Sequence, residues 1–226
     1  MARRSLFRNV LRAVLWTGLA LVVIFAGLVA LYAAVPPVST LMLARLAEGK
    51  SYERTYVPLT KIAPVAVAAV VASEDATFCD NDGVDWDSLT AVLSLRNGPN
   101  RGASTITMQT AKNLFLWPGR SYIRKGLEIP IALTLGAIWP KRRTLEVYLN
   151  IAEWGDGVYG IEAASQRYFH KSAGALTVGE GALLAVALPN PAKRDPSRPK
   201  AFHRRLAAAI VTRVRESSPE SFACLK

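Results

Sequence analysis

The chain has 226 residues, of which 51% are hydrophobic, and its 28 Lys and Arg against 17 Asp and Glu give a formal net charge of +11. This length and composition suit one ordinary domain with a sizeable core and an appendage. The positive charge favours an anionic partner, which could be nucleic acid, a membrane surface or a phosphorylated substrate.

An uncharged N-terminal stretch predicts a membrane anchor. Residues 13–35 carry no charge, and at about 1.5 Å per residue a helix of that length spans the roughly 30 Å hydrocarbon core of a bilayer. A cleaved signal peptide is the alternative, because Ala33-Ala34-Val35 resembles a cleavage site. However, the apolar region of a signal peptide is usually about 7–15 residues long. We therefore expect a transmembrane helix at 13–35.

Basic residues precede this helix. The segment 1–12 holds four arginines, and no acidic residue occurs before Glu48. By the positive-inside rule the segment 1–12 is cytoplasmic, and the residues from Pro36 onward lie outside. This topology argues against nucleic acid as the partner of the basic body and favours a lipid-linked or cell-envelope substrate. Cys79 and Cys224 could pair in an oxidising compartment, but their separation gives no reason to expect it.

The rest of the chain predicts successive helices behind a linker at 36–56. The domain at 57–226 shows no convincing two-residue alternation of apolar and polar side chains, so we expect a mainly α fold. Asp85, Ser104 and Thr177 are the expected N-caps of three helices, and Pro130 should kink or break a fourth. One expected helix begins near Pro64. The others cover 85–96, 104–116, 121–139, 141–151, 160–169, 177–188 and 199–215, and a loop is expected at 153–157.

Two adjacent carboxylates follow the apolar run 64–72. If this run is a helix, Glu74 and Asp75 lie at its C-terminal end, where the helix dipole disfavours negative charge and raises the pKa of a carboxylate. A general base that works near neutral pH needs such a pKa. A solvated pair that closes a helix is the ordinary alternative.

A later loop suits a phosphate. Residues 101–113 combine small residues, hydroxyls and two cations around a predicted helix start. Backbone N–H groups at such a start, together with Ser104, Thr105 and Lys112, would suit a phosphate or pyrophosphate. An ordinary capped loop is an equally good interpretation.

The segment 124–128 places opposite charges on one helix face. Arg124 and Lys125 lie four and three residues before Glu128, which is the spacing of neighbours on a helix. A surface ion-pair ladder is the usual meaning of this spacing. The apolar residues that follow Glu128 favour instead a partly buried carboxylate between two cations, which would be a stiff electrostatic element beside a leaving group.

Other candidate sites are weaker. His170 and His203 lack the spacing of zinc ligands. Ser197 and Lys200 have the spacing of an acyl-transfer nucleophile and its lysine, but a proline interrupts the helix that this motif needs. Asp156, which lies between two glycines, is more typical of a turn than of a catalyst.

Six stretches resemble, in order, the successive motifs of the peptidoglycan glycosyltransferases, the membrane-anchored enzymes that polymerise lipid II. They are SEDATF (73–78), GVDWDSL (83–89), RGASTITMQTAKNLFLW (101–117), RKGLE (124–128), KRRTLEVYLNIAEWGDGVYGIEAASQRYF (141–169) and ALLAVALPNP (182–191). The likeness extends over most of residues 57–215. The chain ends where class A penicillin-binding proteins continue into a transpeptidase domain, so it is most similar to the monofunctional biosynthetic members. The resemblance implies a single lysozyme-like helical domain at 57–226 behind the transmembrane helix.

The resemblance also implies catalytic roles for two glutamates. Glu74 matches the glutamate that deprotonates the 4-hydroxyl of the acceptor sugar, and Glu128 matches a second glutamate near the pyrophosphate of the donor. The implied substrate-binding residues are Asp75, Phe78, Ser104, Thr105, Gln109, Lys112, Asn113, Arg124 and Lys125. No tightly bound cofactor is implied. A divalent cation, Mg²⁺ or Mn²⁺, could meet the pyrophosphate with Glu128 as its only candidate contact.

The implied reaction is an inverting transfer that joins lipid II into linear β-1,4 glycan strands and releases undecaprenyl pyrophosphate. It would take place at the outer face of the cytoplasmic (inner) membrane, on a single-pass protein with a periplasmic or extracellular catalytic domain. The expected partners are lipid II, the nascent glycan strand, the bilayer and proteins of the cell-wall synthesis machinery. Two alternatives are a lysozyme-like lytic enzyme and a non-catalytic, membrane-anchored envelope scaffold.

The chain departs from the family pattern at a few positions. Met108 stands where most relatives have a glutamine, Asn81 replaces a frequent histidine, and Ala91 replaces an arginine that many members carry. Cys79 and Pro130 are also unusual. None of these positions is one of the two glutamates or the Arg124-Lys125 pair, so the departures bear on affinity rather than on activity.

Overall fold

The structure is a computed structural model, and it describes residues 2–94, 103–119 and 121–225. The chain divides into two compact units, with the boundary after Pro36. Each unit is described by itself.

The first unit consists of one long helix, α1 (Ala2–Tyr32). Its part Leu6–Tyr32 contains 27 residues and includes a window with a mean hydropathy of 2.6. At about 1.5 Å per residue this part is longer than the roughly 30 Å hydrocarbon core of a bilayer. The helix begins earlier than the expected span 13–35, at Ala2, and ends three residues earlier, at Tyr32. It is long and apolar enough to cross a membrane.

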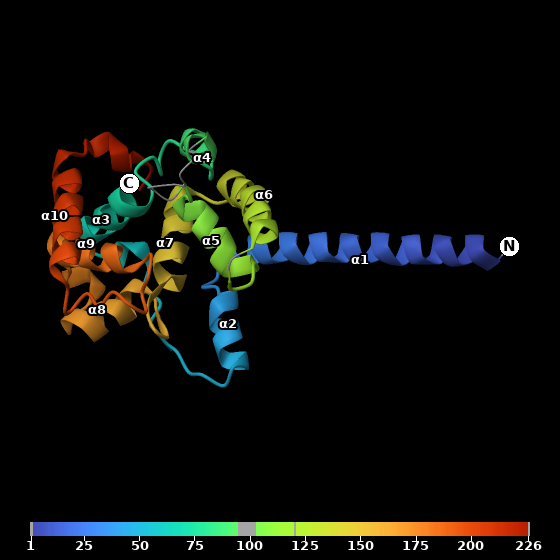
Figure 1. Cartoon of the computed structure of the whole chain (residues 1–226), viewed down its shortest axis with the longest axis horizontal. Coiled ribbons are helices and arrows are strands. Elements are labelled where there is room, and N and C mark those ends of the chain that lie inside the picture. Colours follow the sequence, from blue (N-terminus) through green and yellow to red (C-terminus); the bar gives the residue numbers. More distant parts are fainter. Residues whose placement is uncertain (1, 95–102, 120, 226) are drawn as a thin grey trace. The chain divides into compact units, whose positions relative to one another are not determined.

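The second unit is mainly helical, as predicted, and one group of its helices is formed by α3 (Pro64–Glu74), α9 (Val178–Ala187) and α10 (Ala201–Glu216). Figure 1 shows these three helices packed against one another. Helices α3 and α9 can approach closely because Gly181 has no side chain. A Cβ atom at this position would lie only 2.7 Å from the Cα atom of Ala66. The small side chains of both helices therefore bury α3, which carries Glu74 at its end.

A second group consists of α5 (Ile106–Phe115), α6 (Tyr122–Ile138) and α7 (Lys141–Ile151). Helix α5 packs against both α6 and α7 (Figure 1). Further helical elements are α4 (Trp86–Ser94), α8 (Ile161–Phe169), and the short 3-10 helices η1 (Leu59–Lys61), η2 (Ala173–Ala175) and η3 (Pro219–Leu225). One core of buried side chains joins both groups and includes Phe78, Ile106, Leu145 and Trp154.

A small sheet lies where only a loop was expected. Strands β1 (Glu53–Arg54), β2 (Glu153–Gly155) and β3 (Val158–Tyr159) pair in the order β1-β3-β2, parallel between β1 and β3 and antiparallel between β2 and β3. The prediction of a loop at 153–157 was therefore wrong for its first part. Strands of two or three residues are too short to show an alternating pattern in the sequence.

The segment 36–56, expected to be a linker, contributes two elements to the second unit. Helix α2 (Thr40–Ala47) is capped by Ser39, whose Oγ atom accepts a hydrogen bond from the N–H of Met42 at 3.1 Å. Met42 is fully buried, and the Thr40 hydroxyl donates to the backbone carbonyl of Asn113 at 3.0 Å. These contacts hold α2 against α5, and β1 follows it.

The predicted helix boundaries are confirmed in part. Asp85 caps α4 by accepting from the N–H of Ser88 at 2.8 Å, and Thr177 forms the expected capping box with Glu180. The prediction of Ser104 as a cap was wrong, because Thr105 caps α5. The predicted break at Pro130 was also wrong, since α6 continues through this residue. The expected end of α4 near residue 96 lies outside the described residues.

Candidate active site

Glu74 is the last residue of α3, and its side chain lines a pocket. Pro64 occupies the first turn of the helix, where its missing N–H costs nothing, and an apolar run keeps the helix buried until Ser73 and Glu74. The pocket has a volume of about 290 Å³. It is lined by the end of α3, the start of α4, the loop before α5 and one residue of α10: Ala72, Ser73, Glu74, Asp75, Ala76, Thr77, Asp85, Ser88, Ala103, Ser104, Thr105 and Arg213.

The carboxylate of Glu74 is held by neutral donors. Its Oε2 atom accepts a hydrogen bond from Nε2 of Gln109 at 3.0 Å, and the hydroxyl of Ser73 lies 3.5 Å from Oε1. Burial raises the pKa of Glu74, and the Gln109 hydrogen bond with the charges of Lys112 and Arg194 acts in the opposite direction. A carboxylate with a raised pKa at the edge of a pocket is suited to accept a proton.

The neighbouring carboxylate, Asp75, organises the backbone. It is 6% exposed, and its Oδ2 atom accepts from the N–H of Ile106 at 3.0 Å, at the start of α5. Its Oδ1 atom accepts from Nδ2 of Asn81, also at 3.0 Å. Burial raises the pKa of Asp75, and these hydrogen bonds oppose that rise. Both oxygens are therefore occupied, and Asp75 ties the end of α3 to the start of α5.

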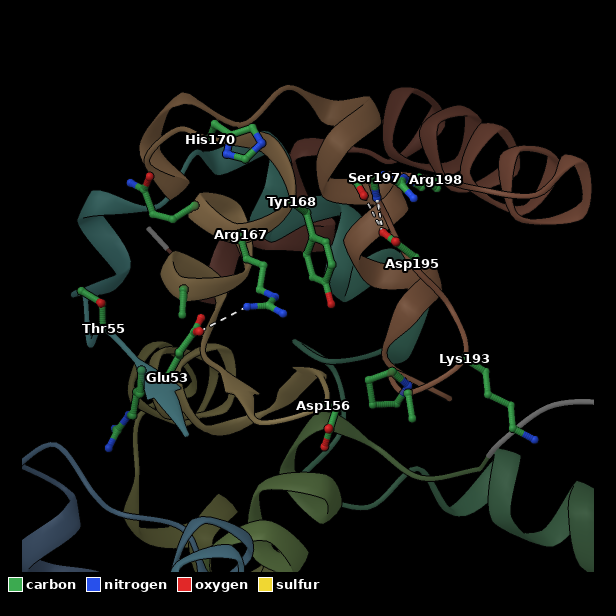
Figure 2. A pocket seen from close by; sticks show the side chains of 15 residues that line it. Glu53, Thr55, Asp156, Arg167, Tyr168, His170, Lys193, Asp195, Ser197 and Arg198 are labelled. Atoms are coloured by element: carbon green, nitrogen blue, oxygen red, sulfur yellow. Dashed lines mark hydrogen bonds and ion pairs between the residues drawn. The ribbon is translucent and has the colours of Figure 1, made fainter. Parts of the chain in front are cut away.

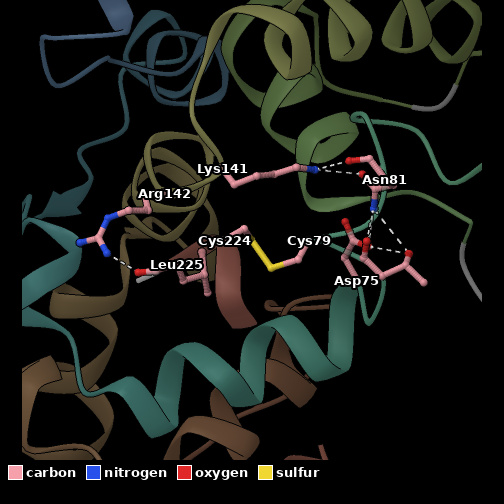
Figure 3. Close-up of a disulfide and its surroundings, with 8 residues drawn as sticks. Asp75, Cys79, Asn81, Lys141, Arg142, Cys224 and Leu225 are labelled. Atoms are coloured by element: carbon pink, nitrogen blue, oxygen red, sulfur yellow. Dashed lines mark hydrogen bonds between the residues drawn. A yellow bond between two sulfur atoms is a disulfide. The ribbon is translucent and has the colours of Figure 1, made fainter. Parts of the chain in front are cut away.

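The loop after Asp75 is fixed from several sides. Asn81 also accepts from the N–H of Gly83 at 3.0 Å, and the ammonium of Lys141 donates to the Asn81 backbone carbonyl. The same ammonium lies 4.7 Å from the centre of the Phe78 ring, and the Phe78 side chain is fully buried. Figure 3 shows Lys141, Asn81 and Asp75 in this arrangement. Asn81, which replaces a frequent histidine, thus takes a structural role beside the Glu74 loop.

A disulfide between Cys79 and Cys224 closes this loop against the C-terminal segment (Figure 3). The two Cα atoms lie 5.5 Å apart although 145 positions separate them in sequence. This pair could not be expected from the sequence, because the packing of η3 near α7 is what brings Cys224 to the loop. Arg142, on α7, also donates to the backbone carbonyl of Leu225. A disulfide is typical of proteins outside the cytosol.

The charged residues of α6 form a second cluster. Glu128 is 3% exposed; its Oε1 atom accepts from Nη1 of Arg124, and its Oε2 atom accepts from Nζ of Lys125 at 2.9 Å. Ser121 caps α6, and Arg124 and Glu128 lie on the buried side of this helix with Lys125 half-buried beside them. The buried carboxylate between two cations therefore follows the sequence prediction.

Two residues connect this cluster to the Glu74 pocket. Lys125 donates to the hydroxyl of Ser104 at 2.6 Å, and Ser104 lines the pocket. Lys112, on α5, interacts electrostatically with both Glu128 and Glu74. Burial lowers the pKa of Lys112, and among the described residues no partner within ion-pair distance satisfies its ammonium. Together Lys112, Arg124, Lys125 and Glu128 carry a net charge of +2, which suits a phosphorylated group.

The other predicted binding residues lie deeper. Gln109 contacts Glu74 directly, whereas Phe78, Thr105 and Asn113 are 5% exposed or less. The Thr105 hydroxyl donates to the carbonyl of Gly83 at 2.6 Å, and Asn113 lies beneath Thr40 of α2. Thr105 also lines the Glu74 pocket, whereas Phe78 and Asn113 are not among its lining residues. A direct contact with substrate stays a prediction for all three. Arg101, at the start of the phosphate-suited loop, lies outside the described residues.

Three residues near Glu74 were not predicted from the sequence to belong to the site. Arg194 is held by a 2.7 Å hydrogen bond from Nη1 to the carbonyl of Val186, and its charge acts on Glu74. It follows the stretch 182–191 by three positions, so a longer motif would have included it. Tyr148 lies in the stretch 141–169 that resembles the family but has no predicted role, and it donates to Gln109 at 3.2 Å. Arg213, which lines the pocket, carries no motif that could have marked it.

The residues present do not suit a metal ion held by the protein. Both carboxylate oxygens of Glu128 accept hydrogen bonds from cations, and a divalent ion would have to displace Arg124 or Lys125. The described part of the chain contains no group of three or more His, Cys, Asp or Glu side chains that could hold a metal ion. The cluster is built to meet negative charge.

A larger pocket lies elsewhere and contains none of the predicted site residues. Its volume is about 920 Å³, and its walls come from β1, α8 and the segment 191–198 (Figure 2). An ion pair of 3.2 Å joins Arg167 to Glu53 across it, and the Ser197 hydroxyl donates to Asp195 at 2.7 Å. Asp156 also lines it and pairs with Arg45 at 2.7 Å.

Comparison with known proteins gives a consistent result. A family model described as transglycosylase matches residues 40–215. A biosynthetic peptidoglycan transglycosylase of Agrobacterium fabrum is 49% identical over 215 residues, which cover 93% of this chain and 95% of that protein. Proteins of the same name are 51% identical in Brucella suis, over 89% of this chain and 91% of the relative, and 53% identical in Rhodospirillum centenum, over 79% of each.

Proposed function

Since the chain belongs to the peptidoglycan transglycosylase family and is thus a glycosyltransferase of peptidoglycan synthesis, we propose that it polymerises lipid II into linear β-1,4 glycan strands. The observation that carries this proposal is the placement of Glu74. Its carboxylate, with a pKa raised by burial, faces a pocket whose rim is connected to a cluster of net positive charge. Such a site can accept a proton on one side and hold a pyrophosphate on the other.

Glu74 is the general base in this proposal. Its carboxylate accepts the proton of the acceptor 4-hydroxyl while that oxygen attacks the anomeric carbon of the donor. The new bond joins O4 to C1, and the bond between C1 and the pyrophosphate oxygen breaks with its electron pair going to the pyrophosphate. Attack from the opposite face inverts the anomeric centre. A base positioned in this way contributes about 10²–10⁴-fold to a rate.

Lys112, Arg124 and Lys125 stabilise the leaving group. Undecaprenyl pyrophosphate is a good leaving group, so it needs neutralisation of developing negative charge more than protonation. Lys112 has no counter-ion within ion-pair distance among the described residues, and this leaves its charge available to the substrate. Glu128 orients Arg124 and Lys125 through its two occupied oxygens. Any divalent cation would arrive on the pyrophosphate rather than on protein ligands.

We also propose a topology for the anchor. Helix α1 would cross the cytoplasmic (inner) membrane with the arginines of the segment 1–12 inside. The second unit would then lie outside, where lipid-linked substrate is exposed. The Cys79–Cys224 disulfide supports an oxidising environment for this unit.

Polymerisation by purified full-length protein tests the proposed function. Wild type and Glu74→Gln are incubated with labelled lipid II in detergent or vesicles, and products are separated by size. We expect long glycan from the wild type and at least a 100-fold lower rate from Glu74→Gln. Glu48→Gln, at an exposed ion pair with Lys50, is the matched control. No polymer from the wild type, equal rates, or cleavage of preformed glycan instead of synthesis would contradict the proposal.

A further inference from the structure

Tyr148 and Gln109 form a chain of hydrogen bonds that ends at Glu74. The Tyr148 hydroxyl donates to Oε1 of Gln109 at 3.2 Å, and Nε2 of Gln109 donates to Oε2 of Glu74 at 3.0 Å. Tyr148 comes from α7, Gln109 from α5 and Glu74 from α3. Tyr148 is 1% exposed, so its hydroxyl cannot reach the pocket or a substrate there.

The orientation of the Gln109 amide decides whether Glu74 faces a hydrogen-bond donor or an acceptor. With Nε2 toward Glu74, the amide donates a hydrogen bond, which favours the ionised carboxylate. With the amide reversed, its oxygen would face Glu74 and could be satisfied only by a protonated carboxyl group. The two orientations of one side chain therefore correspond to the two protonation states of Glu74.

Tyr148 favours the first orientation because its hydroxyl hydrogen needs an acceptor. Gln109 is the only hydrogen-bond partner of this hydroxyl within the described ranges. If the amide reversed, its NH₂ group would face the tyrosine oxygen and the buried O–H would lose its acceptor, which costs about 1–3 kcal/mol. Burial raises the pKa of the Tyr148 hydroxyl well above its usual value, so the group stays a donor at any working pH.

We propose that Tyr148 is a positioning residue for the transfer reaction: it fixes the amide of Gln109, and through that amide it keeps Glu74 ready to accept a proton. This inference rests on the proposed role of Glu74 as the general base. It adds a residue that is not among those lining the pocket and that acts on the base through the hydrogen bond to Gln109.

Other groups also act on Glu74, and none of them changes when the Tyr148 hydroxyl is removed. Lys112 and Arg194 favour the charged form from α5 and from the segment after α9, and Ser73 does so from α3 itself. Asp75 follows Glu74 directly and disfavours a second negative charge nearby. A shift in the titration of Glu74 in a Tyr148→Phe protein would therefore report on the hydrogen-bond chain.

The pH dependence of polymerisation tests the proposal. Tyr148→Phe keeps the ring and removes only the hydroxyl. We expect the acidic limb of kcat to move upward by about 0.5–1 pH unit, so that kcat on this limb is up to about 3- to 10-fold lower and recovers at higher pH. KM for lipid II should stay within about twofold, because Tyr148 does not touch the substrate.

Tyr168→Phe is the matched control, since it removes a tyrosine hydroxyl that donates to the carbonyl of Trp154 at 3.3 Å, away from Glu74. It should leave the pH profile unchanged. Thermal unfolding of each variant shows whether the fold is intact. A merely structural role for Tyr148 would lower the amount of active protein without moving the acidic limb.

A double-mutant cycle isolates the path through Gln109. In a Gln109→Ala background, Tyr148→Phe should cause no further shift of the acidic limb. An unchanged limb in Tyr148→Phe, or an equal shift with and without Gln109, would overturn the inference while leaving Glu74 as the base. Full activity of Glu74→Gln would instead overturn the proposed function itself.

Discussion

Glu74 and Glu128 are held by opposite kinds of neighbour. Glu74 accepts from the neutral amide of Gln109 and has no cation within ion-pair distance among the described residues, whereas both oxygens of Glu128 accept from Arg124 and Lys125. The first environment leaves a carboxylate free to gain and lose a proton. The second ties the carboxylate to two cations and orients them. These neighbours suit Glu74 to the proposed role of proton acceptor and Glu128 to the proposed role of orienting two cations.

The largest expected difference between variants of the two glutamates is in the free energy of unfolding. Glu128→Gln removes the charge that compensates Arg124, a 9% exposed residue, and breaking a buried ion pair by removing one partner typically costs about 3–5 kcal/mol. Chemical denaturation should show a loss of this size. Glu74→Gln should cost nothing, because a partly buried carboxylate without a counter-ion is replaced by a neutral group. A similar loss in both variants would remove the distinction between them.

Loss of the disulfide should loosen the loop that follows Glu74 and Asp75 and should leave helix α6 unchanged. It joins the loop after Asp75 to the C-terminal segment. Replacement of Cys79 and Cys224 by serine should lower the free energy of unfolding by about 2–4 kcal/mol, because the crosslink constrains the unfolded chain. Hydrogen exchange should increase at residues 75–83 and remain unchanged in α6. Uniform increases across both regions would show that the disulfide does not brace this loop in particular.

Lys112 should separate activity from stability. Its ammonium is partly buried without an ion pair in the described part of the chain, so its charge is costly to the fold and useful to an anionic substrate. Lys112→Met should reduce kcat/KM by about 10- to 100-fold, while the free energy of unfolding stays equal or rises. Lys50→Met, at an exposed ion pair, is the control and should change neither quantity. A less stable Lys112→Met protein would indicate that Lys112 serves the fold.

The smallest expected effect is the pH dependence of stability. Burial raises the pKa of Glu74 above its ordinary value of 4.5. The folded state therefore binds a proton more readily than the unfolded state in the window above pH 4.5, and stability falls as pH rises through this window. Denaturation curves should show a weaker fall in Glu74→Gln than in the wild type. An equal fall in both proteins would mean that Glu74 does not titrate abnormally.

The sequence predicted the helices and the charged face of α6 well because both follow from local patterns. Capping residues such as Asp85 and Thr177, and the spacing of Arg124 and Lys125 to Glu128, act over a few residues. The position of Glu74 at the end of α3 follows from Pro64 and the apolar run after it. These features need no knowledge of tertiary packing.

Contacts between distant segments could not be predicted in this way. The disulfide depends on how η3 packs near α7, and the short strand β1 pairs with β3 across more than 100 residues. The link from Tyr148 to Gln109 requires α7 and α5 to pack at one particular rotation. The resemblance to a known family marked Gln109 and Glu74 but did not indicate which residue orients them.

The pH–rate profile of lipid II polymerisation tests the central claim most directly, when wild type, Glu74→Gln and Glu128→Gln are compared under one set of conditions. We predict an acidic limb in the wild type that reflects protonation of Glu74. The limb should persist in Glu128→Gln at a reduced maximum rate and be absent from the residual activity of Glu74→Gln. An acidic limb that remains in Glu74→Gln and disappears in Glu128→Gln would contradict the assignment of the two carboxylates.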